Sequence, residues 1–224
     1  MTIWTDGLHV LLDGAWAVFS ILIPIIWGHT LFSAAFRKIF KTDFTDIEYF
    51  SLGMAGWILP AALWVAGTFL FGEAAIIAAS VLAVVIFIFA LYSGWPRRIS
   101  IWPGLALTFL LAASLVLQLA FLEKTILPLY FDSAEHYRII KYLADTYDLS
   151  SFLLPSAAYY HVGFHLLIAA ISRLFQLDIV NVMLVFGQVM LAILPFSLFF
   201  IARQETQSNA AAFFACLLAG FGWH

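Results

Sequence analysis

The stretch AAIIAASVLAVVIFIFA at residues 74–90 decides the class of fold that this sequence can adopt. It contains no charged residue, and its side chains do not alternate between apolar and polar as they would in a transmembrane β-strand. A helix that crosses the hydrocarbon core of a bilayer needs about 20 predominantly apolar residues. The stretch is therefore typical of a transmembrane helix, and it continues without charge through residues 74–96.

Six other charge-free windows of similar length occur in the chain, and charges are costly inside the hydrocarbon core. They cover residues 14–36, 49–72, 99–122, 149–172, 179–202 and 206–224. We therefore predict an all-α, polytopic membrane helix bundle with about six or seven transmembrane helices. A re-entrant or tilted arrangement stays open for one of the last three windows, because Arg173 and Arg203 would otherwise lie on opposite sides of the membrane.

The composition agrees with a membrane protein and excludes other classes. The chain has 224 residues, of which 64% are hydrophobic and 10% charged, whereas soluble domains carry about 25% charged residues. Ten Lys and Arg against thirteen Asp and Glu leave no basic surplus for binding nucleic acid. A single cysteine, Cys216, excludes a disulfide framework and a cysteine-rich zinc site. The expected partner is the lipid bilayer, and no nucleic acid is expected.

Basic residues set the expected orientation, because cytoplasmic loops are enriched in Lys and Arg. Clusters at residues 37–41 and 97–98 follow the first and third windows, so both loops are expected in the cytoplasm. The N-terminus and an outer loop at residues 123–158 then lie outside an integral membrane protein of the plasma (inner) membrane. The N-terminal transmembrane region at 1–122 would contain four helices. Further transmembrane helices follow at 159–224, where we expect the chain to be truncated.

The outer loop contains a pattern that predicts an amphipathic helix at the membrane interface. From Ser133 onward apolar residues recur at helical spacing, while charged residues lie off that stripe. The stripe comprises Ala134, Tyr137, Ile140, Leu143, Ala144 and Tyr147. Residues 123–148 also contain five acidic and three basic residues, so most of the candidate chemistry lies in this segment.

Two acidic residues at the start of this helix, Asp132 and Glu135, admit two interpretations. One is a capping box, in which Asp132 caps the helix and the Glu135 carboxylate reaches back to the N-cap amide. The other is a catalytic or metal-binding acid at the boundary between membrane and water. The two interpretations are compatible, because a helix start that fixes a carboxylate also orients it.

Three histidines accompany these acids. His136 follows Glu135 directly, and His161 and His165 are four residues apart, which would place both on one face of a helix. Such a pair can bind a metal, but the glutamate of an HExxH site is missing, which favours an interfacial polar cluster. The sequence therefore indicates no definite cofactor, and a divalent metal ion stays an open alternative.

The order of these parts resembles the C-type membrane glycosyltransferases (the GT-C superfamily). The resemblance covers about residues 120–224. It rests on the segment DSAEHY at 132–137, on the amphipathic helix and on the segment YYHVGFH at 159–165. It implies that the chain is the N-terminal part of an enzyme that transfers a sugar from a polyprenyl-phosphate donor. The acceptor would lie on the outer membrane face.

The resemblance also implies roles for individual residues. Asp132 would be the general base that activates the acceptor hydroxyl, with Glu135 as the second candidate. Basic and aromatic side chains near the lipid phosphate would bind the donor and stabilise the leaving group. The implied substrate-binding residues are His136, Arg138, Tyr160, His161 and His165.

Two other functions are compatible with the residues. A transporter or permease fragment would carry ionisable groups inside its spans, whereas the windows here are free of charge. An inverted repeat would favour that function. A non-catalytic membrane scaffold would need Asp132 and Glu135 only as caps. It would tolerate Asp132→Ser, because serine caps a helix equally well.

Overall fold

The computed structural model describes residues 3–22, 39, 62, 64–92, 101–122, 132–148 and 162–222. Over these residues the fold is all-α and contains no strand, which confirms the all-α part of the prediction. The labelled helices are α1 (Ile3–Asp13), α4 (Glu73–Tyr92), α5 (Ile101–Ala120), α6 (Ser133–Thr146), α7 (Val162–Phe175), α8 (Ile179–Thr206) and α9 (Asn209–Phe221). Residues 15–22 and 64–71 are also helical.

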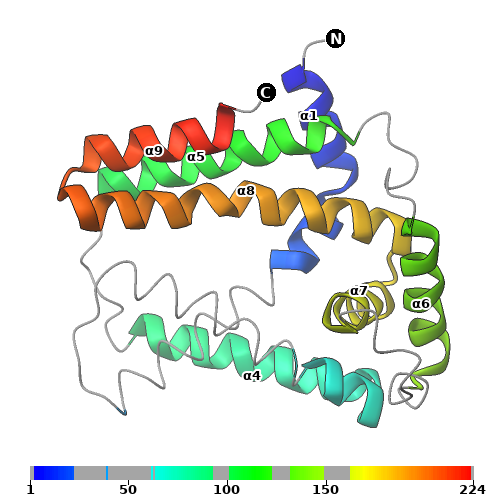
Figure 1. The fold of residues 1–224 in the computed structure, drawn as a ribbon. Helices are drawn as coiled ribbons and strands as arrows, with labels where there is room; N and C mark the ends of the chain where they lie inside the picture. The colour runs from blue at the N-terminus through cyan, green and yellow to red at the C-terminus, as the bar shows by residue number, and fades with distance from the viewer. Residues whose placement is uncertain are drawn as a thin grey trace.

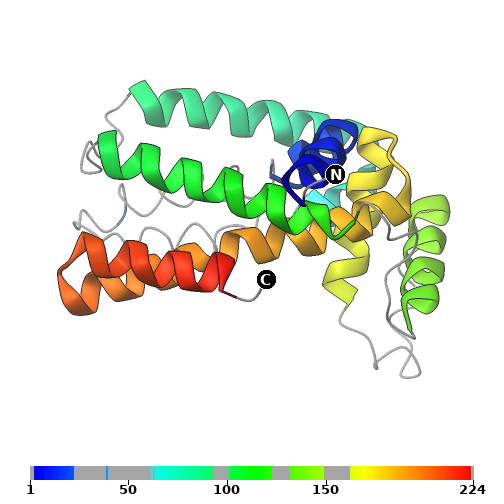
Figure 2. The same cartoon turned by 90° about the horizontal axis from the view of Figure 1, so that it is seen from above.

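The axes of the long helices are roughly aligned, and the two short helices α6 and α7 lie across them. In Figure 1, α4, α5, α8 and α9 all extend from side to side, and Figure 2 shows the same alignment from above. α6 lies across one end of these helices in both views. α7 is seen end-on in Figure 1, so it runs across α8 and not along it. The bundle therefore has two different ends, and α6 marks one of them.

One helix in the described part of the chain, α8, is long and apolar enough to cross a membrane by length and composition. It begins at Ile179, the first residue of its predicted window, where the Asp178 carboxylate accepts a hydrogen bond from the Asn181 amide at 3.0 Å. Shorter apolar segments occur at Leu105–Ala120, Gly163–Phe175 and Asn209–Phe221. The full set of six or seven spans stays a prediction.

The window at 149–172 was expected to cross the membrane, and the described part of it does not extend along the long helices. α7 has 14 residues, which at about 1.5 Å per residue is shorter than the roughly 30 Å hydrocarbon core. It also continues past Arg173 to Phe175. The alternative of a tilted or re-entrant segment therefore stays open for this window, as it does for the window of α9, which has 13 residues. Residues 149–161 lie outside the described part.

The predicted amphipathic helix is present as α6, and its apolar face fixes it to the bundle. Ile139, Ile140, Leu143 and Ala144 are buried in the main core, which α7 and α8 also help to form. Three of these four belong to the predicted stripe, and Ile139 adds a neighbouring position to it. Ala134, which the stripe included, is exposed. The polar residues of α6 are therefore held at the end of the bundle.

Two glycines permit close or tight backbone geometry. A Cβ at Gly7 would lie 1.8 Å from the carbonyl oxygen of Val116, so α1 packs on α5 through bare backbone. Gly72 has a φ of +71° between the helical residues 64–71 and α4, a conformation that favours glycine. The helical segments therefore separate at Gly72, next to Glu73, the charged residue between the windows 49–72 and 74–96.

Candidate functional site

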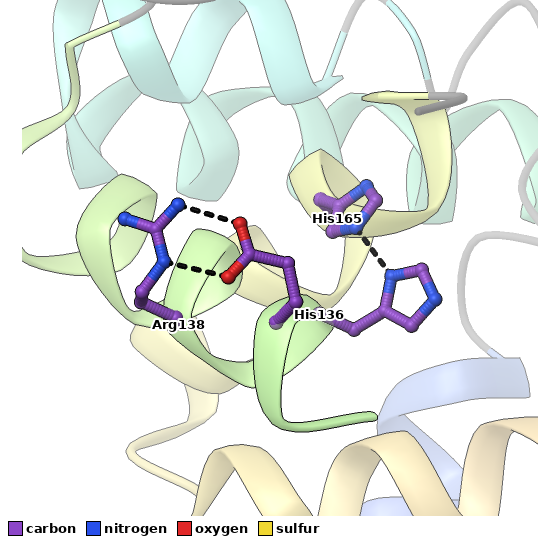
Figure 3. Close-up of polar contacts among 4 residues, drawn as sticks. His136, Arg138 and His165 are labelled. Carbon is purple, nitrogen blue, oxygen red and sulfur yellow. Dashed lines mark hydrogen bonds and ion pairs between the residues drawn. The ribbon is translucent and has the colours of Figure 1, made fainter. Parts of the chain in front are cut away.

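Three of the predicted site residues meet at the start of α6. His136 Nδ1 lies 2.7 Å from His165 Nε2 on α7, and His136 Nε2 lies 3.3 Å from Asp132 Oδ2. Figure 3 shows the two imidazoles facing each other across the gap between the two helices. A carboxylate and two imidazoles thus form a continuous chain of polar contacts.

The chain of contacts runs from the surface into the core. The side chain of Asp132 is 52% exposed and that of His136 is 27% exposed, whereas His165 is buried at 1%. Phe164 packs edge-on against both imidazoles, with ring centroids 6.1 Å from His136 and 5.7 Å from His165. The exposed end of the chain is a carboxylate, which is the group that an external reactant would meet first.

Asp132 does not act as a side-chain cap, so the capping-box interpretation is wrong. It occupies the N-cap position of α6 with φ −92° and ψ 4°, and its carboxylate makes no capping hydrogen bond. Side-chain capping usually requires an extended backbone at this position, from which the carboxylate reaches the amides of the first turn. Here the carboxylate contacts His136 instead. Glu135 does not reach back either, because its carboxylate is bound by Arg138.

Glu135 and Arg138 form a two-pronged ion pair on the surface of α6. Arg138 Nε donates to one Glu135 oxygen at 2.8 Å, and Nη2 donates to the other at 2.6 Å (Figure 3). The hydrogen bond from Arg138 lowers the pKa of the Glu135 carboxyl, aided by the charges of Arg138, His136 and His165 and opposed by partial desolvation. The same pair raises the pKa of Arg138. Both oxygens of Glu135 are therefore occupied by the Arg138 guanidinium.

Replacing Arg138 with glutamine should raise the pKa of Glu135 toward the ordinary glutamate value. Because the pKa of Glu135 is lowered in the folded protein, the ion pair contributes its full stabilisation above the ordinary glutamate pKa. That stabilisation is lost as the pH falls through the lowered pKa. Carboxyl ¹³C NMR of Glu135 against pH measures this change. Lys141→Gln is the matched control, since it removes the neighbouring pair with Asp145 and should leave Glu135 unmoved. An unchanged titration of Glu135 in the Arg138 variant would contradict the assignment.

Two predicted substrate-binding residues, Tyr160 and His161, lie outside the described residues. The anticipated pairing of His161 with His165 is therefore not visible, and the partner that the structure gives to His165 is His136. Among the described side chains, no group of three His, Cys, Asp or Glu residues is arranged to hold a metal ion. The described residues therefore give no support to the alternative of a divalent metal.

A second polar cluster, which the sequence patterns did not indicate, joins three helices at the same end of the bundle. Arg173 Nε donates to the Tyr147 hydroxyl at 3.0 Å and lies 3.4 Å from Glu73 Oε1. Tyr147 ends α6 with a φ of +54° and packs edge-on against Phe69. Arg173 thus ties the ends of α6 and α7 to the start of α4. No sequence spacing could have revealed this contact between distant segments.

Comparison with known proteins finds no matching family model, no matching curated protein and no matching solved structure. The chemistry of the site is therefore interpreted from its own residues. The exposed Asp132 carboxylate is held by an imidazole, which suits proton transfer from an incoming hydroxyl.

Proposed function

We propose that this chain is part of a membrane glycosyltransferase in which Asp132 is the general base. The substrate would be a sugar carried by a polyprenyl phosphate, and the acceptor would be a hydroxyl group on the outer membrane face. The observation that carries this proposal is the state of Asp132. Its carboxylate is half exposed, is not used to cap α6 and is held through Oδ2 by His136.

The reaction needs only groups that this surface offers. The acceptor oxygen attacks the anomeric carbon of the sugar while its proton passes to the Asp132 carboxylate. The bond from that carbon to the phosphate oxygen breaks, and its electron pair leaves with the polyprenyl phosphate. Arg138 is the candidate to stabilise the developing phosphate charge, because its guanidinium is exposed on the same helix and presents a fork of donors.

Asp132 is a better candidate base than Glu135. Both oxygens of Glu135 accept hydrogen bonds from Arg138, and the pKa of its carboxyl is lowered. A lowered pKa makes the carboxylate a weaker proton acceptor. For Asp132, the contact with His136 involves Oδ2, and Oδ1 is the oxygen that would take the proton in this proposal. Glu135 therefore acts in this proposal as the resting partner of Arg138.

The exposed apolar side chains support a set of spans formed by α4, α5, α8 and α9. On α4, large aliphatic side chains that are each more than half exposed lie mainly along one side of the helix: Ile77, Val81, Leu82, Val84, Val85 and Ile88. Burying apolar surface is worth about 25 cal/mol per Å², so such a surface is unfavourable in water and favourable in lipid. In a bilayer crossed by these helices, α6 would lie on the surface, since it crosses their ends (Figures 1 and 2).

The distribution of basic residues supports an external position for α6. Arg203, in the last turn of α8, is at the opposite end of the bundle from α6 (Figure 1). The cluster at residues 97–98 follows α4, which ends on the side of Arg203. Arg173 is at the α6 end but is paired there with Glu73. With the basic end in the cytoplasm, the Asp132 site faces outward.

Cysteine labelling in intact cells tests this orientation. Asp145→Cys on α6 should react with a membrane-impermeant maleimide added outside, whereas Glu205→Cys at the far end of α8 should react only after permeabilisation. The native chain is the control, because its one cysteine, Cys216, is 2% exposed and should label weakly. Labelling of both variants from outside would contradict the proposed topology.

The experiment that tests the function measures release of polyprenyl phosphate from sugar-charged donors in proteoliposomes. The full protein is compared with its Asp132→Asn variant on a panel of polyprenyl-phosphate hexoses. Release that depends on both an acceptor and the carboxylate supports the proposal. Release that is equal in the two proteins contradicts it.

A further inference from the structure

We propose that His165 is a positioning residue that fixes the tautomer and the ring of His136, so that His136 presents an N–H to Asp132. This inference rests on the proposed function in one respect, namely that Asp132 is the base whose orientation matters. His165 itself is buried, so it acts through His136 and does not touch a reactant.

When His136 is neutral, as at alkaline pH, its contacts determine where the protons lie. A carboxylate is an acceptor, so a bare lone pair on His136 Nε2 would be repelled by Asp132 Oδ2 at 3.3 Å, and Nε2 must carry the proton. A neutral imidazole has one N–H, which leaves Nδ1 of His136 as an acceptor. At 2.7 Å from that atom, His165 Nε2 must then be the donor. The tautomer of His136 is therefore set by His165.

The burial of His165 also favours a positioning role over one in stability. Its neighbours along α7, from Leu167 to Ile171, are apolar and buried in the core. Burying a polar ring there costs free energy unless it is hydrogen-bonded, and an apolar side chain would avoid that cost. A role in holding His136 through a hydrogen bond explains why a polar ring occupies this buried position.

Holding His136 in turn holds Asp132. Because the carboxylate makes no capping bond to α6, its contact with His136 is the interaction that restrains the side chain at its exposed position. Misplacing a catalytic group by about 1 Å can cost up to 100-fold in rate. Loss of the His165 donor should therefore reduce turnover without removing the base.

The test compares two variants at the same position. His165→Leu removes the donor, and His165→Gln keeps an amide N–H near the site of Nε2. We expect the leucine variant to lose about tenfold in kcat with little change in KM for the donor. The glutamine variant should recover most of that loss. Ser172→Ala, at another buried polar position on α7, is the matched control and should leave the rate unchanged.

A second readout does not depend on transfer. The ¹⁵N NMR spectrum of His136 at alkaline pH should show one tautomer, with the proton on Nε2, in the native protein and in His165→Gln. It should show mixed tautomers in His165→Leu. A single tautomer and a native rate in His165→Leu would overturn the inference. If transfer proves independent of Asp132, the proposed function fails, while mixed tautomers in the leucine variant would still support the histidine contact.

Discussion

Replacing Asp132 with asparagine should reduce sugar transfer by roughly 100- to 10,000-fold, the usual contribution of a general base. The amide is almost the same size and its oxygen can still lie against His136 Nε2, so the start of α6 should keep its geometry. What disappears is the group that takes the proton from the acceptor. The measurement is kcat for polyprenyl-phosphate release in proteoliposomes, with the amount of inserted protein determined separately.

Two further variants make this result specific. Asp145→Asn changes a carboxylate on the same helix that pairs with Lys141 at the surface, and it should leave transfer intact. Asp132→Ser keeps a residue type suited to capping a helix but supplies no base, so it should be as inactive as the asparagine variant. A scaffold would tolerate the serine variant fully. Native activity in either Asp132 variant would therefore contradict the proposed role of Asp132 as general base.

Replacing Leu143 with alanine should weaken the packing of α6 on the bundle. The expected loss of stability is about 2–5 kcal/mol, the range for truncating a fully buried leucine. Leu143 is 0% exposed and belongs to the core that α6 shares with α7 and α8. Because His136 and His165 meet across this packing, weaker docking should also reduce transfer. Hydrogen exchange of the α6 amides reports the local stability directly.

The control for Leu143 lies two residues earlier on the exposed face. Lys141→Ala removes one surface ion pair, and such pairs contribute about 0–1 kcal/mol. Its α6 amides should exchange almost as slowly as those of the native protein. Equal exchange in the leucine and lysine variants would show that α6 is held by something other than its buried face.

The helices follow from the sequence where local chemistry decides them. The spacing of Ile140, Leu143 and Ala144 predicts the buried face of α6, because one helix face meets the core every three or four residues. The start of α8 follows from Asp178, a capping residue placed directly before an apolar run. The charge-free windows also anticipate α4 and α5 to within a few residues.

The sequence could not predict features that depend on contacts between helices. A charge-free window shows that a segment tolerates lipid, but not the direction in which it runs, and so it could not indicate that α7 lies across α8. His136 and His165 are separated by 29 residues, and only the packing of α6 on α7 brings them together. The capping box failed because Arg138, three residues after Glu135, competes for the same carboxylate.

The length of α8 has a consequence for the depth of the site. Its charge-free part, residues 179–202, extends about 36 Å, whereas the hydrocarbon core of a bilayer is about 30 Å thick. A span with such hydrophobic mismatch tilts or extends into the headgroups, and the balance shifts with lipid chain length. α6 and α7 pack against α8, so the height of Asp132 above the acyl chains would vary with bilayer thickness. Membrane composition would thereby help to determine which lipid-linked donors reach the carboxylate.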